Sequence, residues 1–173
     1  KKEKFDLIIA SDILRTKETA EIVAPILGIK NITYDKRLRE INLSSLAGCH
    51  DAEYHKRFPT YESRFQGAPE GGETLRDIRA RVWGLLQDTE KEYRGKKILL
   101  VSHEYPIWMT CEAAEGWSEK ETIRQKVIRG ERFIKVAEYR KLNFKVSPRN
   151  EAGEVDLHRP YVDQVKLPCH KCR

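Results

Sequence analysis

The sequence predicts an α/β domain with a mostly parallel sheet. Short apolar runs alternate with segments of helical periodicity, as in β-α-β units. One run, residues 97–102, reads Lys-Ile-Leu-Leu-Val-Ser, which is typical of a strand buried on both faces of a parallel sheet. The length of 173 residues allows one domain with a sizeable core, so we expect one domain followed by a tail.

The first predicted unit is a strand, a helix and a second strand. Residues 5–10 are apolar and predict a strand, and Ser11 and Asp12 after them favour a helix N-cap. The helix should span residues 14–27, with Gly28 as its C-cap, and the next strand residues 29–34. The apolar face of this helix is expected to contain Leu14, Ala20, Ile22, Val23 and Ile26.

The rest of the domain begins with a long irregular segment. Residues 35–72 are rich in Gly and Pro and predict mostly loop, with one short helix around residues 52–58. A clear helix then opens at Glu73-Thr74 and ends before Gly95. The sequence next predicts the strand at 97–102, a helix starting near Pro106 and a strand pair within residues 132–144. A boundary near Lys145 is expected to separate a domain of residues 1–145 from a tail of residues 146–173.

Composition excludes some classes of protein. The net charge is +6, but 33 basic and 27 acidic residues are interspersed, which favours a mixed solvated surface over a nucleic-acid face. No apolar run approaches the roughly 20 residues that a membrane helix needs, and no signal-peptide pattern is present. The four cysteines do not suggest a disulfide framework, so we expect a cytoplasmic location. The opening without Met suggests a piece of a longer chain.

Two polar segments follow predicted strands and should meet. Ligands of open parallel sheets bind at the carboxyl ends of the strands, where Ser11 to Arg15 and Ser102-His103 are expected. A guanidinium suits the bidentate binding of phosphate oxygens, and a helix N-terminus favours an anion. Taken alone, Arg15 could form a surface salt bridge and His103 could be a capping or core histidine. Their combination suggests an anion site.

The motifs and their order resemble the histidine phosphatase superfamily, which has the phosphoglycerate-mutase-like fold. The resemblance rests on Ser11–Ala20 (SDILRTKETA), Leu38–Ile41 with Gly48 shortly after, Gly71–Thr74, and Val101–His103. It covers roughly residues 5 to 144. This resemblance implies a three-layer α/β sandwich that acts on a phosphate ester through a phosphohistidine, without a metal or organic cofactor.

The same resemblance implies roles for three residues. Arg15 matches the arginine that grips the phosphate. His103 matches the second histidine, which binds the phosphoryl oxygens and takes part in catalysis. Glu40 matches the acid that protonates the leaving oxygen and later activates water, a role that needs a carboxyl group. A salt bridge of Glu40 with Arg37 or Arg39 is the structural alternative. The expected partner is a phosphorylated small molecule or another anion.

The sequence departs from the family pattern at two places. The family's Arg-His-Gly motif, which supplies the phosphorylated histidine on the first strand, does not occur, so the first strand and the nucleophile are expected to be missing. His50, His55, His158 and His170 are expected on the surface instead. In addition, Glu104-Tyr105 follows His103, where the family commonly has glycines. A carboxylate there would repel a dianion unless it turns away or meets a cation.

The tail resembles a different family. Residues 153–163 (GEVDLHRPYVD) and the Cys169-x-x-Cys172 pair are similar to class I isoleucyl-tRNA synthetases, over about residues 153–173. Two cysteines make half of a zinc site, so zinc could bind there in a longer chain. The alternative function is thus a non-catalytic, structural or RNA-contacting part of an isoleucine-tRNA ligase. Basic residues within 124–145 could then contact tRNA.

Overall fold

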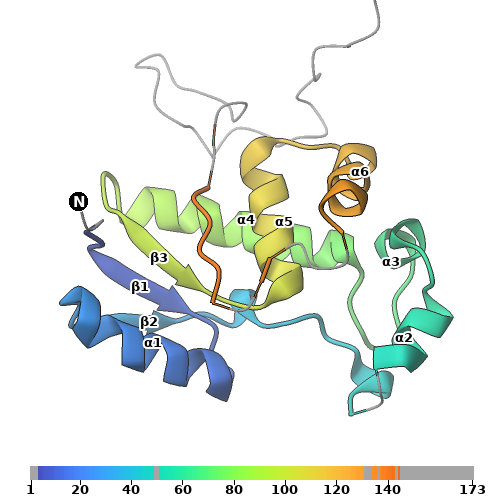
Figure 1. Cartoon of the computed structure of the whole chain (residues 1–173), viewed down its shortest axis with the longest axis horizontal. Coiled ribbons are helices and arrows are strands. Elements are labelled where there is room, and N and C mark those ends of the chain that lie inside the picture. Colours follow the sequence, from blue (N-terminus) through green and yellow to red (C-terminus); the bar gives the residue numbers. More distant parts are fainter. Residues whose placement is uncertain (1–3, 49–50, 131–133, 136, 143, 145–173) are drawn as a thin grey trace, which may run out of the picture.

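Three parallel strands form the sheet of the computed structural model (Figure 1), which describes residues 4–48, 51–130, 134–135, 137–142 and 144. β1 (Leu7–Ala10) lies between β2 (Ile32–Tyr34) and β3 (Ile98–Val101). Ile8 is in register with Ile32 on one side and with Leu99 on the other. The predicted parallel α/β fold is confirmed, although β2 is shorter than the predicted strand.

Helices cover both faces of the sheet, which gives three layers (Figure 1). Alternate residues of a strand point to opposite faces. Ile8 and Ala10 of β1 therefore pack in one cluster with α1 (Leu14–Leu27). Ile9, between them, packs on the other face with Leu85 of α4 (Leu75–Glu92). The short apolar strands are thus buried by a helix on each side.

The buried face of α1 differs from the predicted one. Thr16, Ala20 and Ala24 are buried, whereas Leu14, Ile22 and Ile26 are 65–73% exposed. Ala20 and Ala24 are small, so this helix can lie close to the sheet while its larger residues point outward. The predicted cap is also wrong in part. Gly28 ends the helix in the left-handed region at φ 71°, but the N-cap is Ile13, without a side-chain hydrogen bond.

The segment between β2 and α4 contains two 3-10 turns and two short helices. They are η1 (Lys36–Leu38), η2 (Ser44–Leu46), α2 (Asp51–Arg57) and α3 (Tyr61–Gln66). α2 agrees with the helix predicted around residues 52–58, but α3 was not predicted. Thr60 caps α3 in a capping box with Ser63, a signal that could have located it.

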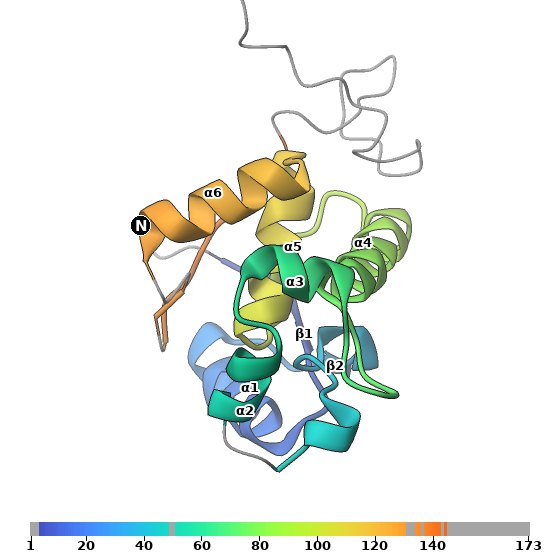
Figure 2. The same ribbon diagram turned by 90° about the vertical axis from the view of Figure 1, so that its right-hand side faces the viewer.

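α4 begins where the sequence predicts, because Thr74 and Asp77 form a capping box. α5 (Glu104–Glu115) packs along α4, with Trp108 fully buried between the helices and α3. α6 (Glu119–Arg129) follows a turn at Gly116 and was not predicted. Figure 2 shows α3, α5 and α6 side by side. This helical layer adjoins the end of the sheet where β3 runs into α5.

Two expectations about strands are wrong: the late strand pair within residues 132–144 and the full burial of the strand at 97–102. The described residues of the segment predicted as a strand pair, namely 134–135, 137–142 and 144, form no strand. Their apolar side chains pack instead: Tyr139 contacts the ring of Phe5 edge-on, and Leu142 and Phe144 pack near Trp83. β3 is consequently the edge strand of the described sheet, and its residues are half-buried rather than fully buried.

No helix within the described ranges is long and apolar enough to cross a membrane. The tail, with His158, His170, Cys169 and Cys172, lies outside the described residues, and so does His50. The boundary near Lys145 and the half zinc site therefore stay predictions.

Candidate functional site

The parallel pairing of β1 with β3 brings Arg15 and His103 together. Ser11 follows β1 and His103 follows β3, so both lie at the carboxyl edge of the sheet. Arg15, in the first turn of α1, donates from Nε and Nη2 to Nδ1 of His103, over 3.1 and 2.7 Å. These residues are 88 positions apart in the sequence. The predicted convergence of the two segments is present in the structure.

The hydrogen bonds define the state of the His103 ring. A guanidinium can only donate, so Nδ1 is the unprotonated acceptor and the ring proton is on Nε2. Nε2 lies 3.0 Å from Oγ of the fully buried Ser11. Burial, followed by the positive charges of Arg15 and Arg81, lowers the pKa of His103 from 6.5 to about 4. His103 is therefore neutral near pH 7 in the absence of an anion.

This electrostatic environment predicts an unusual titration. We expect His103 to gain its second ring proton only near pH 4, with Nε2–H as the neutral tautomer, as measured by ¹⁵N NMR of the imidazole. Because an unfolded histidine binds its proton near pH 6.5, His103 should make the folded state less stable as the pH falls from 6.5 to about 4. Added phosphate should raise the titration midpoint. A midpoint near 6.5 without ligand would contradict the contact with Arg15.

Glu40 reaches the same edge of the sheet through η1. Leu38 is buried, and its carbonyl accepts a 2.7 Å hydrogen bond from Ser102 Oγ, next to His103. Arg81 of α4 donates to the backbone carbonyls of Arg37 and Glu40 and forms an ion pair with Glu73. Arg81 thus holds the backbone at Arg37 and Glu40 in place.

The pKa of the Glu40 carboxyl is raised above that of an exposed glutamate. Burial raises its pKa, against the opposing effects of the Ile41 and Tyr105 amides and the Arg15 charge, and the Glu104 charge adds to the rise. The structural alternative for Glu40 is not found. No ion pair within the described residues joins Glu40 to Arg37 or Arg39, which pair with Asp35 and Asp12 at 2.8 and 2.6 Å.

A single cavity contains the predicted residues. Arg15, Glu40 and His103 all line a cavity of about 1080 Å³, together with Glu104. From this polar end the cavity extends along β3, past Leu99, to Lys96. It therefore combines a polar end, which contains Arg15 and His103, with an apolar channel beside β3.

Sequence reasoning placed Ser11 at this edge of the sheet but missed its contact with His103, and it missed Arg81 altogether. Ser11 was expected to cap a helix, but its hydroxyl meets His103, and Asp12 pairs with Arg39. Arg81 follows Ile78 at three residues and precedes Leu85 at four, a spacing that already places it on the buried face of α4. The predicted surface residue His55 is exposed on α2.

No group of three or more potential metal ligands occurs within the part of the chain that is described.

Fold and site together define an α/β protein with a polar pocket at the carboxyl ends of parallel strands. The model of the histidine phosphatase superfamily (branch 1) matches residues 1–148. The chain belongs to the histidine phosphatase superfamily. Members of this family need no metal cofactor.

Several relatives and solved structures resemble the chain. The probable phosphoglycerate mutase GpmB of Escherichia coli is 35% identical over 121 residues, which is 65% of this chain and 56% of the relative. The chain thus spans little more than half the length of this relative. A mycobacterial glucosyl-3-phosphoglycerate phosphatase superposes with a TM-score of 0.61 at 23% identity, covering 72% of this chain and 64% of that one. YhfR of Bacillus stearothermophilus superposes with a TM-score of 0.59 at 28% identity, covering 68% of this chain and 60% of that one.

Proposed function

We propose that this domain transfers the phosphoryl group of a phosphate ester, with Arg15 and His103 binding the phosphoryl oxygens. The observation that carries the proposal is the direct contact of these two residues in a cavity that Glu40 also lines. The mycobacterial phosphatase of similar fold has been solved with inorganic phosphate and with VO3, which supports a phosphate-like anion as the ligand of this domain.

A bound phosphoryl group complements the charges of this pocket. The Arg15 guanidinium offers a planar fork of donors, and charge-assisted hydrogen bonds are about twice as strong as neutral ones. A dianion beside His103 offsets the positive charges that lower the pKa of this ring, so anion binding favours the protonated ring. Arg15 and His103 then stabilise the charge that spreads over the oxygens in the transition state.

The nucleophile, in this proposal, is a histidine on a strand outside the residues of this chain. Among the described residues no strand pairs with the outer edge of β3, which supports a place for that strand, because the cavity lies along β3 and includes His103. A parallel strand added there would end at the same carboxyl edge as β1 and β3. The residue after it would then lie beside Arg15 and His103.

Glu40 moves the protons in two steps. First the histidine nitrogen bonds to phosphorus, the bond to the leaving oxygen breaks, and Glu40 gives its proton to that oxygen. Water then attacks phosphorus, the nitrogen–phosphorus bond breaks, and Glu40 takes a proton from the water. The raised pKa of Glu40 suits the first step, because it keeps the acid protonated to higher pH.

Calorimetric titration with vanadate tests the binding, on the protein together with its natural upstream sequence. We expect saturable binding at one site, and transfer of phosphorus from an aryl phosphate to an acid-labile, base-stable phosphohistidine. Binding without phosphohistidine would leave an anion site and remove the catalytic part of the proposal. No binding at all would favour a structural domain.

The tail supports a second proposal on the parent protein. The similarity of residues 153–163 and of the Cys169–Cys172 pair to isoleucyl-tRNA synthetases suggests a fusion to, or insertion in, an isoleucine-tRNA ligase. Such a parent would bind tRNA and could complete a zinc site at the cysteine pair. Sequencing the gene on both sides of this segment tests it, since a ligase must supply further motifs for binding ATP.

A further inference from the structure

Glu104 places a carboxylate at the polar end of the cavity. It is the first residue of α5, directly after His103, and lines the cavity with Arg15 and Glu40. Its side chain is 40% exposed, and its charge acts on the carboxyl of Glu40. Glu104 thus presents a carboxylate to the same cavity in which Arg15 and His103 are proposed to hold the phosphoryl group.

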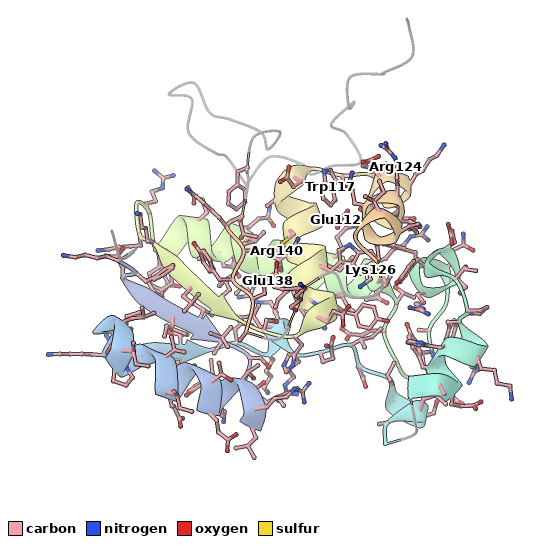
Figure 3. All side chains as sticks on the ribbon, in the orientation of Figure 1. Glu112, Trp117, Arg124, Lys126, Glu138 and Arg140 are labelled. Carbon is pink, nitrogen blue, oxygen red and sulfur yellow. The ribbon has the colours of Figure 1, made fainter. Side chains whose placement is uncertain are left out.

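A buried lysine holds this carboxylate. Lys126 on α6 is only 2% exposed, and its Nζ lies 2.6 Å from Oε1 of Glu104. The ammonium group also lies over the rings of Trp108 and Tyr61, 5.1 and 5.9 Å from their centroids. Figure 3 labels Lys126 beside α6. Of its partners, Glu104 and Trp108 belong to α5, and Tyr61 belongs to α3.

The position of Lys126 is fixed by further contacts of α6. Glu119, in the first turn of this helix, accepts hydrogen bonds of 2.6 and 2.8 Å from Arg76 of α4. Its carboxylate also lies 3.5 Å from Arg79. A two-point contact between a guanidinium and a carboxylate restricts orientation as well as distance. The lysine is thus presented to Glu104 by a helix that is anchored to the core.

We propose that the Glu104–Lys126 pair selects the leaving group: it favours phosphate esters of uncharged, hydroxyl-rich or cationic alcohols over esters of alcohols that carry a carboxylate. This inference rests on the proposed phosphoryl transfer and names its substrate class. It differs from the activity that the name of the Escherichia coli relative suggests, because a phosphoglycerate carries a carboxylate.

The chemistry of the pair explains the preference. Lys126 offsets part of the charge of Glu104, so the pair repels the phosphoryl dianion, which Arg15 and His103 attract, less than a lone carboxylate would. Within the described residues, Oε2 of Glu104 has no hydrogen-bond partner, so it can accept from a hydroxyl or an ammonium. A substrate carboxylate at the same place would lie next to the two acceptor oxygens of Glu104. It could not pair with Lys126, because Lys126 is already bound to Glu104. Repulsion between the carboxylates of Glu104 and of the substrate would therefore weaken binding.

The test compares three esters of similar size: glycerol 3-phosphate, phosphoethanolamine and 3-phosphoglycerate. The full-length protein should show a kcat/KM at least about 10-fold lower for 3-phosphoglycerate than for the other two. Glu104→Gln frees the lysine charge and should reduce or reverse this ratio. Lys126→Met leaves the carboxylate unpaired and should increase the ratio and weaken vanadate binding.

The double variant Glu104→Gln with Lys126→Met carries no charge at this place and should bring the kcat/KM ratio close to 1. It also keeps the test valid if Glu104→Gln alone does not fold, because the double variant leaves no buried lysine charge unpaired. Arg124→Gln is the matched control, since Arg124 lies on the exposed side of α6 and pairs with Glu121 (Figure 3). It should leave the ratio as in the parent protein.

The outcomes separate the two proposals. If all esters turn over and neither Glu104→Gln nor the double variant changes the ratio, the pair does not select the leaving group, while phosphoryl transfer stands. A preference of the parent protein for 3-phosphoglycerate would overturn the inference in the same way. If no ester turns over and vanadate does not bind, the proposed function itself fails.

Discussion

Replacing Glu40 with glutamine is expected to lower kcat for an alkyl phosphate by about 100- to 10,000-fold in the full-length protein, the usual contribution of a positioned general acid. Glutamine keeps the size of the side chain and can still accept from the Ile41 amide, which lies 2.9 Å from Oε1 of Glu40. It cannot supply a proton. Steady-state kinetics with an alkyl phosphate would measure the loss.

The leaving group provides the internal control for Glu40→Gln. A nitrophenolate leaves without a proton, so the variant should lose far less activity with nitrophenyl phosphate. Because the pKa of Glu40 is raised, kcat for the alkyl ester in the parent protein should fall as the pH rises through this pKa, and the variant should lose that fall. Equal losses with both esters would show that Glu40 is not the acid.

Replacing Arg15 with alanine should weaken vanadate binding by about 100-fold, because two charge-assisted donors are removed from the pocket. This loss should come from the site itself, because Arg15 contacts His103 from the first turn of α1. Arg15 is exposed, so the substitution should cost little stability. Isothermal calorimetry on the parent protein and the variant gives the two dissociation constants.

The matched control is Arg94→Ala, which removes one positive charge from an exposed position after α4. It should leave vanadate binding within about twofold, since exposed charges at a distance are screened by salt. Arg15→Ala should also raise the pKa of His103, because the Arg15 charge is one of the causes of its lowering. A variant that binds vanadate normally would place the anion elsewhere.

The parallel α/β sheet and the proximity of Arg15 to His103 could be predicted from the sequence for clear reasons. Short apolar runs such as residues 5–10 and 97–102 have few alternatives to strands, and parallel strands bring their carboxyl ends together. Arg15 and His103 were therefore expected at one edge before the structure placed them there. Their chemical roles, and that of Glu40, remain predictions that the experiments above test.

The features that could not be predicted depend on tertiary packing. α1 has two possible apolar faces, and only the close approach to the sheet selects the side with Ala20 and Ala24. The residues of the expected late strand pair are apolar because they cover the core near Trp83. Lys126 looks like an ordinary surface lysine in the sequence, since nothing local shows that Tyr61 and Trp108 surround it.

The parallel pairing of β1 with β3 also has a consequence for how the chain folds. The two strands are neighbours in the sheet but far apart in the sequence, because α1, β2 and α4 are synthesised between them. β1 cannot pair with β3 until the segment between them has been synthesised, and closing the long loop that this segment forms slows folding. Arg15 and His103 meet only after this closure. If the proposed anion site binds phosphate, this binding reports a finished sheet, and phosphate in the refolding buffer should stabilise only the completed fold.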